Sequence, residues 1–309
     1  MTLSVVVPTL NGRDQLAAGL DALAAHAPDA EVIVVNGPSA DGTTGMVRDR
    51  EDVDVLVEIS DRTVNVARNA GIEVATGDRI ALVDYDNRIE PSWIEGVRSG
   101  LGRADVVTGP VCRSLPAGRT TETIERRRIA GREVAYFAGG NVAFRSAVLS
   151  DLDGFDEHLR TGGARDLAHR LAGYEYDLVW EPAVSVECEP SGEASADGGE
   201  QGDTDWRWKY RALAYRLAKN YGLRPTVIRR IGSHAIGDAT SVARDVLGGE
   251  ATPCGWAGNG REVVTGTARG FAEGMVARAR DRSPRRNPNG ISKRADRAVA
   301  KYDWREDAR

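Results

Sequence analysis

The sequence predicts an α/β fold built around a mixed, largely parallel sheet. Short apolar runs with the pattern of buried strands alternate with segments whose apolar residues recur at helical spacing. Short connections join strand, helix and strand, which implies right-handed crossovers and parallel pairing. In such sheets ligands bind at the carboxyl ends of the strands, so the residues directly after each apolar run are the first candidates for a site.

The elements follow one another in a regular order through the first 190 residues or so. Residues 3–8 form an apolar strand that is followed by turn chemistry, and three leucines then recur at i, i+4 and i+7 on one face of a helix that ends before Pro28. Further strands are expected at residues 31–35, 53–59, 79–83, 104–108, 134–144 and 183–187, and helices at 64–75 and 166–171.

Composition places the chain among globular proteins. Its 309 residues are enough for one large α/β domain and an appendage, with 41% apolar and 28% charged residues. The three cysteines lie far apart, so neither a zinc site nor a disulfide framework is indicated. No apolar run reaches the length of about 18 residues that a membrane span needs, and the N-terminus lacks a signal-peptide pattern. We therefore expect a cytoplasmic protein.

The charged residues are unevenly distributed. Residues 187–205 contain seven acids and no base in a stretch rich in Gly and Ser, whereas residues 206–237 contain eight bases and no acid. Only four of the 41 basic residues are lysines. This pattern predicts a first domain at residues 1–190, an acidic linker or loop at 191–205, and a basic, mostly helical C-terminal extension at 206–309.

Two aspartates follow directly after the strand expected at residues 79–83. Asp84 and Asp86, which are separated by Tyr85, can both reach a divalent cation or its ligands, and their hard oxygen atoms suit Mg²⁺ or Mn²⁺. A nucleotide diphosphate would supply the remaining oxygens. Because Asp-x-Asp turns are common in an acidic chain, the significance of the triplet depends on the motifs around it.

Those motifs form an ordered series. They are VVVPTLNG at residues 5–12, VIVVNGPSADGT at 32–43, NVARNAGIEVATGDRIALVDYDN at 65–87, GGNVAFRS at 139–146 and GFDEHLRTGGARDLAHRL at 154–171. In order and spacing, the series resembles the family 2 glycosyltransferases of the GT-A fold over about residues 3–188. The resemblance implies a nucleotide-diphospho-sugar transferase that uses Mg²⁺ or Mn²⁺.

The resemblance also implies a role for each matching residue. Asp86 corresponds to the metal ligand, and Asp166 to the base that accepts the proton of the acceptor hydroxyl. The residues that correspond to the nucleotide-sugar-binding set are Pro8, Thr9, Asn11, Asn36, Arg68, Asp84, Tyr85, Gly139, Gly140 and Asn141. A single base without a second carboxylate nucleophile implies one displacement, and therefore inversion at the anomeric carbon.

Three positions depart from the family pattern. Asn36 replaces an Asp that accepts a hydrogen bond from the uracil base, and an amide oxygen is a weaker acceptor. Arg165 replaces the Glu of the usual Glu-Asp pair, so Asp166 is alternatively only a helix cap. Cys188 or Glu189 stands where many relatives carry a metal-binding His, which would leave the metal to Asp86 and the diphosphate.

The basic extension begins with an amphipathic pattern. Between residues 206 and 221 aromatic and aliphatic residues recur on one helix face and are surrounded by bases. This helix either packs on the first domain or binds peripherally to an anionic membrane surface through its aromatic residues. A second basic segment at residues 278–290 adds to the charge. The acidic whole and the lack of a recognised binding motif argue against a nucleic-acid partner, and we expect none.

The sequence thus predicts an inverting glycosyltransferase that moves a sugar, with UDP as the expected carrier, to a lipid-linked or other glycan acceptor in surface-glycan assembly. Its expected location is the cytoplasm, with peripheral contact at the membrane. The alternative is a non-catalytic nucleotide-sugar-binding or scaffold protein of the same fold. A nucleotidyltransferase would require a glycine-rich, basic phosphate loop after the first strand, and residues 9–12 do not form one.

Overall fold

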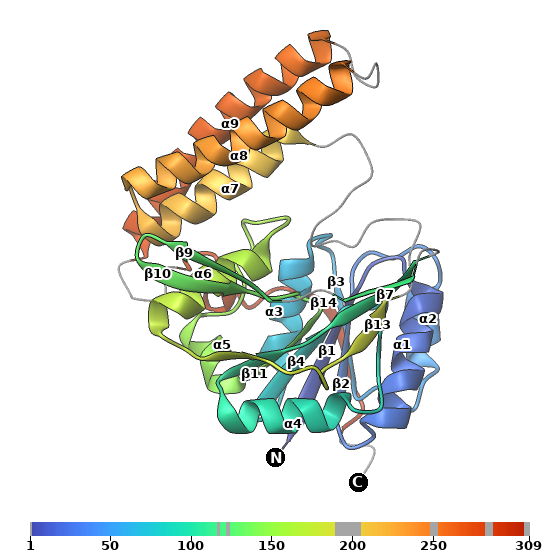
Figure 1. Cartoon of the computed structure of the whole chain (residues 1–309). Helices are drawn as coiled ribbons and strands as arrows, with labels where there is room; N and C mark the ends of the chain where they lie inside the picture. Colours follow the sequence, from blue (N-terminus) through green and yellow to red (C-terminus); the bar gives the residue numbers. More distant parts are fainter. Residues whose placement is uncertain are drawn as a thin grey trace.

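A computed structural model describes residues 2–115, 118–121, 124–188, 205–247, 253–281 and 287–305 (Figure 1). The acidic linker expected at 191–205 therefore lies outside the described residues, apart from Asp205. Glu189 and residues 282–286 of the second basic segment also lie outside them.

The body of the molecule is an eight-stranded mixed sheet. Its strand order is β12 (Leu178–Trp180), β6 (Val106–Thr108), β11 (Asn141–Arg145), β4 (Arg79–Val83), β1 (Leu3–Thr9), β2 (Glu31–Asn36), β3 (Val55–Ile59) and β14 (Ala298–Asp303). β11 and β14 run antiparallel to their neighbours, and the other pairs are parallel. The predicted mixed, largely parallel sheet is confirmed.

Hydrophobic cores fill the space on both faces of this sheet. Every residue of β1 is buried, with Val5 and Val7 in one core and Val6 in the other, because successive side chains of a strand point to opposite faces. α1 (Arg13–His26), α2 (Thr43–Arg48) and α4 (Trp93–Arg103) contribute to the first core. α3 (Val64–Val74), α5 (Ser146–Asp151) and α6 (Gly163–Tyr174) contribute to the second.

Smaller sheets complete the body. β5 (Asn87–Ile89), β13 (Val186–Cys188), β7 (Val111–Leu115) and β8 (Gly118–Thr121) form one, and β9 (Glu125–Ile129) and β10 (Arg132–Tyr136) form a hairpin. The single strand expected at residues 134–144 is wrong. It is divided into β10 and β11, because the chain turns at residues 138–141, where the Asn141 amide donates to the Ala138 carbonyl.

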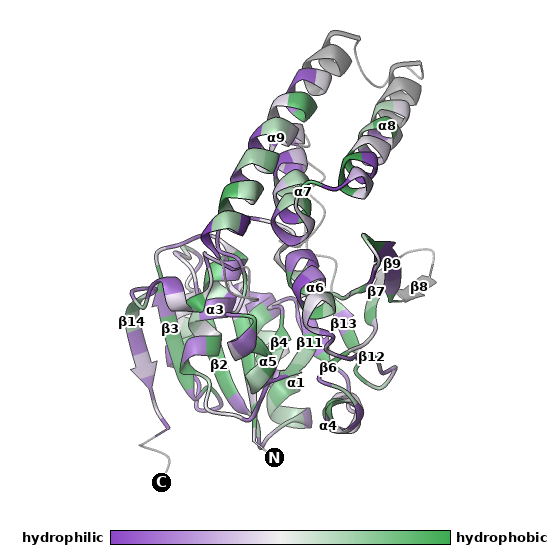
Figure 2. Cartoon of the chain, turned by 90° about the vertical axis from the view of Figure 1, so that its left-hand side faces the viewer, coloured by the Kyte–Doolittle hydropathy of each residue, from purple (hydrophilic) through white to green (hydrophobic). Residues whose placement is uncertain are grey.

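Three helices form an arm that projects from the body (Figures 1 and 2). They are α7 (Trp206–Tyr221), α8 (Pro225–Leu247) and α9 (Pro253–Arg280). α7 packs closely along α9, where Gly266, Gly270 and Gly274 recur every four residues. A Cβ atom on any of them would lie 2.0–2.5 Å from a backbone oxygen of α7. The absence of side chains on this face therefore allows the two backbones to approach.

The apolar face of α7 lies against the body, where Ala214, Leu217 and Tyr221 join the same hydrophobic core as α6. Tyr210, Ala214, Leu217 and Tyr221 are all buried, as the packing interpretation of the helix predicts. Aromatic side chains that are buried in this way are not available to a bilayer. Among the described residues, no helix is long and apolar enough to cross a membrane.

The chain returns to the body after α9. A short 3-10 helix, η1 (Ile291–Lys293), precedes β14, which pairs with β3 at the edge of the main sheet. The Arg297 guanidinium is 1% exposed and forms ion pairs with Glu157 and Glu73. The segment after residue 206 is therefore mostly helical, as predicted, but its end belongs to the sheet. The boundaries of the three predicted regions remain a prediction.

Candidate functional site

The predicted donor-binding residues meet at the carboxyl edge of the main sheet. Thr9 and Asn36 end two adjacent parallel strands and are paired across them, and Asp84 follows the third strand. β11 runs in the opposite direction, so it begins at this edge, where Asn141 is paired with Val83. The topology therefore brings together four segments that are distant in the sequence.

Arg68 and Asp84 form the charged centre of this edge. The Arg68 guanidinium comes from α3, is fully buried, and donates from Nη2 to Asp84 Oδ1 at 3.0 Å. It also lies over the Phe155 ring. Asp84 retains 20% exposure of its side chain. The pair fixes a partly accessible carboxylate at the point where a ligand reaches the strand ends.

Gly139 and Gly140 bring the backbone of the β10–β11 connection against this carboxylate. A Cβ atom on Gly140 would lie 2.1 Å from Asp84 Oδ2, so any larger residue would displace Asp84. The Gly140 carbonyl accepts from the Asp84 amide and from Asn87 Nδ2. These contacts explain why a glycine stands at position 140, directly before β11.

The side chain of Asn141 is part of the framework. It is fully buried, accepts from Trp93 Nε1 at 3.0 Å, and donates to the carbonyls of Pro110 and Val184. Sequence reasoning placed Asn141 among the residues that approach the donor sugar. In the structure its side-chain amide joins β11 to α4, to the β6–β7 connection and to Val184, and its predicted contact with the donor sugar stays a prediction.

Thr9 has a buried hydroxyl whose position suggests a ligand contact. Its Oγ1 has no hydrogen-bond partner in the part of the chain that the structure describes, although the residue is only 4% exposed. Buried polar atoms are normally paired, so an unpaired one at the end of a strand fits a group that a ligand would satisfy. Pro8 precedes it in β1, where β4 no longer pairs with the strand.

Asn36 and Asn11 organise the loop between β2 and α2. Asn36 Oδ1 accepts from Ser39 Oγ at 2.7 Å, and its Nδ2 donates to Thr44 Oγ1 at 2.8 Å. Asn11 Oδ1 accepts from the Ala40 amide at 2.8 Å. The amide oxygen expected to bind a nucleotide base is therefore already in use, although an amide oxygen has a second lone pair.

Asp86 occupies the position expected for a metal ligand. Its Oδ2 lies 3.7 Å from Cys188 Sγ, so Cys188 does stand beside this carboxylate, as its position in the sequence predicts. Tyr85 packs its ring against Gly12. Within the described ranges, no group of three or more His, Cys, Asp or Glu side chains is arranged to hold a metal by itself. Such an ion would need the oxygens of a diphosphate as further ligands.

The structure places Asp166 in a buried network of charges. The carboxylate is fully buried in the first turn of α6 and accepts from Lys219 Nζ at 2.8 Å, Arg170 Nε at 2.9 Å and Asn220 Nδ2 at 3.0 Å. Lys219 Nζ also lies 2.5 Å from Asp156 Oδ2. Lys219 belongs to α7, so this network joins the arm to the body.

These charges determine the protonation of Asp166. Burial alone would raise the pKa of this carboxyl, but Lys219 and Arg170 outweigh burial and hold the pKa well below the usual range. The ion pairs therefore stabilise the fold above the pKa of an unfolded aspartate, about 3.9. That stabilisation is lost as the pH falls below this value.

The network bears directly on the predicted role of Asp166. A general base must come within hydrogen-bond distance of the hydroxyl that it deprotonates. Here both carboxylate oxygens are enclosed, so the role requires Lys219 and Asn220 to move away. The sequence analysis did not identify Lys219 as a partner of Asp166. The chain has only four lysines, and this rarity could have drawn attention to it. A lysine ammonium has three donors and can bind two carboxylates at once.

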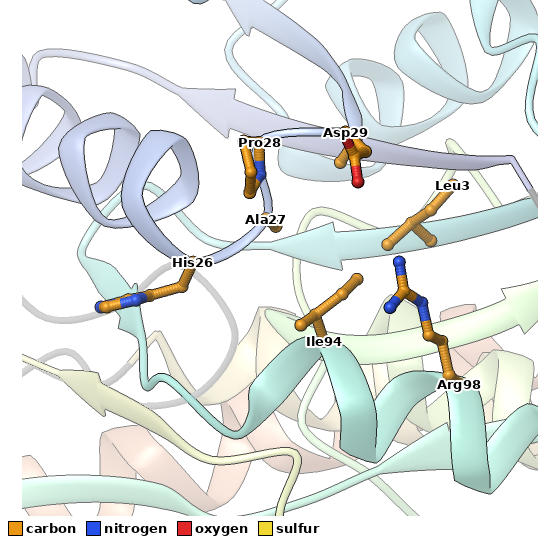
Figure 3. A pocket seen from close by; sticks show the side chains of 8 residues that line it. Leu3, His26, Ala27, Pro28, Asp29, Ile94 and Arg98 are labelled. Carbon is orange, nitrogen blue, oxygen red and sulfur yellow. The ribbon is translucent and has the colours of Figure 1, made fainter.

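A small cavity lies at the opposite edge of the sheet (Figure 3). It encloses about 140 Å³ between the end of α1 and one side of α4, and its polar side chains are His26, Asp29 and Arg98. Leu3, at the amino end of β1, lines it as well. The cavity is therefore separated from the strand ends that carry the candidate site.

Comparison with known proteins places this site in context. Residues 4–152 match the sequence profile described as Glycosyl transferase family 2. The chain is 30% identical over 207 residues to glycosyltransferase AglE of Haloferax volcanii, a match that covers 61% of this chain and 67% of that protein. It is 28% identical over 200 residues to the pre-mycofactocin glycosyltransferase of Mycobacterium tuberculosis, covering 60% of this chain and 42% of that protein.

Two solved structures share the fold at 18% identity. TarS 1–349 from S. aureus, in complex with UDP-GlcNAc, has a TM-score of 0.57 over 72% of this chain and 68% of that chain. The mannosyltransferase PcManGT from Pyrobaculum calidifontis, in complex with GDP-Man and Mn²⁺, has a TM-score of 0.53 over 91% of this chain and 88% of that chain. The second match is long enough to include residues of the helical arm.

We predict that Lys219→Met lowers the free energy of unfolding by about 3–5 kcal/mol, because two buried carboxylates are then left with one buried cation, Arg170. Urea unfolding followed by circular dichroism measures the change. Lys209→Met on the same helix is the matched control. Its ammonium pairs with Asp238 at 2.7 Å but is 47% exposed, so the loss should stay below about 1 kcal/mol. Equal stability of the two variants would contradict the role given to Lys219.

Proposed function

The chain belongs to glycosyl transferase family 2, and on this premise we propose that it transfers a sugar from a nucleotide-diphospho-sugar to an acceptor used in surface-glycan assembly. The membership itself makes it a glycosyltransferase of the GT-A type. The donor, the acceptor, inversion at the anomeric carbon and the use of a metal ion are parts of the proposal.

The convergence of Thr9, Arg68, Asp84 and Gly140 at one sheet edge is the observation that carries this proposal. The Thr9 hydroxyl is buried without a partner among the described residues, and Asp84 is held by Arg68 with part of its surface exposed. A nucleoside offers hydrogen-bonding groups for such a hydroxyl and carboxylate, and the glycines at 139 and 140 allow a sugar to approach the backbone. Asn36 lacks the carboxylate that would select uracil. Both UDP and GDP are therefore compatible with this arrangement.

A divalent cation would be held by Asp86 together with the donor diphosphate. Carboxylate and phosphate oxygens are the ligands that Mg²⁺ and Mn²⁺ prefer. Such an ion stabilises the charge that develops on the departing nucleoside diphosphate. The nearby thiol of Cys188 replaces the oxygen or nitrogen ligand that a further carboxylate or histidine would provide. Binding of donor and cation should therefore depend on each other.

Transfer to an acceptor hydroxyl would use Asp166 as the base, in the role that the family resemblance implies. This step needs a conformation in which Lys219 and Asn220 release the carboxylate, since both of its oxygens are buried and bonded. The same burial favours a second candidate function, a non-catalytic protein that binds nucleotide sugars. Release of nucleoside diphosphate distinguishes the two, because only the enzyme consumes the donor.

Peripheral contact with an anionic membrane is a further part of the proposal, now assigned to α8. Tyr210 and Tyr215 of α7 are buried, whereas Ile228 and Ile236 of α8 are 58% and 67% exposed. The exposed Arg229 lies next to Ile228 on the same helix. Exposed aliphatic residues beside bases are typical of helices that lie at a membrane surface.

We predict that Asp86→Ala abolishes both transfer and metal-dependent donor binding, because the diphosphate loses its link to the protein through the cation. Calorimetric titration of UDP and GDP with and without Mn²⁺ measures binding. Glu95→Ala, which removes a largely exposed carboxylate of α4, is the control and should bind as the parent does. Donor binding that still increases with Mn²⁺ in the Asp86 variant would remove Asp86 from the metal site.

We also predict that the parent chain co-sediments at low salt with phosphatidylglycerol vesicles but not with phosphatidylcholine vesicles. Binding should weaken as salt rises, since surface charges are screened within about 10 Å at 0.1 M salt. A double variant, Ile228→Ser with Ile236→Ser, should lose most of the binding. Val299→Ser on β14, which replaces a residue that is 70% exposed, is the control. Failure of the parent chain to bind anionic vesicles would refute the membrane contact.

A further inference from the structure

A thiol and a carboxylate that are 102 residues apart in the sequence lie side by side at the end of β13. β13 pairs antiparallel with β5, and this register places Cys188 opposite Asn87, the residue that follows Asp86. The Cys188 thiol donates to Asp86 Oδ2, with 3.7 Å between sulfur and oxygen. Asp86 is only 5% exposed and Cys188 only 4%. Sheet pairing and burial therefore fix the positions of both side chains.

The distance between these two atoms suits a shared cation. A zinc ion binds a cysteine sulfur at about 2.3 Å and a carboxylate oxygen at about 2.0–2.2 Å. Two such bonds at a tetrahedral angle place the sulfur and the oxygen about 3.6 Å apart. The observed 3.7 Å from Cys188 Sγ to Asp86 Oδ2 therefore matches two ligands of one ion.

The second buried thiol of the described residues has a different neighbour. Cys112 lies on β7, and its Sγ is 3.6 Å from the hydroxyl oxygen of Ser185. A thiol beside a neutral hydroxyl is the ordinary packing of a buried cysteine. The combination of sulfur with a carboxylate is therefore a property of position 188, and Cys112 provides an internal comparison.

A sulfur ligand changes which cation a site prefers. Carboxylate and phosphate oxygens suit Mg²⁺ and Mn²⁺, whereas a cysteine thiolate favours softer ions such as Zn²⁺. Affinity for nitrogen, oxygen and sulfur ligands also rises from Mn²⁺ to Co²⁺. Coordination would replace the proton of the Cys188 thiol, which is released to the solvent. Oxygens of a diphosphate would supply the further ligands.

We infer that Asp86 and Cys188 together form a mixed oxygen–sulfur cation site, and that this chain binds Zn²⁺ and Co²⁺ more tightly than Mg²⁺. The inference rests on the proposed metal-dependent transfer and names the class of cation that the donor site takes. Cys188 is then the residue that determines cation specificity, while Asp86 is the ligand that any divalent cation at this position would share.

Titration of the full chain with Co²⁺ tests the sulfur ligand directly. A thiolate bound to Co²⁺ gives a charge-transfer absorption band in the near ultraviolet, which oxygen ligands alone do not give. The parent chain should show this band, and added Zn²⁺ should remove it by displacing Co²⁺. Cys188→Ser should lack the band. Cys112→Ser, which changes the other described buried thiol, is the matched control and should keep the band.

Calorimetric titration with Zn²⁺ and with Mg²⁺, in the presence of UDP, measures the preference itself. Cys188→Ser should raise the Kd for Zn²⁺ at least about tenfold, since losing even a contact behind a metal ligand costs about 10- to 100-fold in affinity. The Kd for Mg²⁺ should change far less, because a serine hydroxyl retains an oxygen at this position. Asp86→Asn should weaken the binding of both ions.

Absence of the near-ultraviolet band in the parent chain would overturn the inference whatever the variants show. A band that persists in Cys188→Ser, or equal losses of Zn²⁺ and Mg²⁺ affinity in that variant, would overturn it as well. UDP binding that still increases with Mn²⁺ would leave the proposed function intact in each of these cases. Conversely, a band that depends on Cys188, without any effect of cations on UDP binding or any release of nucleoside diphosphate, would support the cation site and overturn the proposed function.

Discussion

Two buried carboxylates, Asp156 and Asp166, depend on one ammonium group, that of Lys219. Charges of this kind are costly to bury unless they are paired and hydrogen-bonded, so the body of the protein requires α7 to be in place. Because α7 in turn packs along α9, and the chain then returns to add β14 to the sheet, the helical arm is tied to the body at both of its ends. The contact that joins them also encloses the carboxylate to which the family resemblance assigns proton transfer.

Much of the fold could be predicted, because its elements have local signals. β1, β2 and β4 are continuous apolar runs. The resemblance to family 2 glycosyltransferases indicated Thr9, Asn36 and Asp84, and all three lie at carboxyl ends of parallel strands, where ligands bind in such sheets. β14 was missed because its sequence, AVAKYD, is half polar and typical of a short edge strand. The division of residues 134–144 into two strands depends on Asn141, whose partners lie 31 to 48 residues away in the sequence.

The environment of the site residues could not be predicted in the same way. The sequence indicates that Asp166 is either a helix-capping residue or the catalytic base. It does not reveal that Lys219, 53 residues later, forms an ion pair with this carboxylate. The sequence likewise indicates that Asn36 recognises the nucleotide base. In the structure, its amide oxygen and its amide nitrogen are hydrogen-bonded to Ser39 and Thr44, which follow in the chain. Such contacts form only when distant segments pack, so the sequence indicates which residues gather at the site but not which of their atoms remain accessible.

The central claim is that the site at the strand ends binds a nucleotide-diphospho-sugar and that the protein transfers the sugar. Incubation of the full chain with UDP- and GDP-sugars and Mn²⁺, in the presence of hydroxyl acceptors, tests it through release of the nucleoside diphosphate. The account predicts that at least one donor is consumed in an acceptor-dependent reaction that stops when the metal is chelated. Tight binding of nucleotide sugars without release of any nucleoside diphosphate would contradict catalysis, and absence of binding would contradict the site itself.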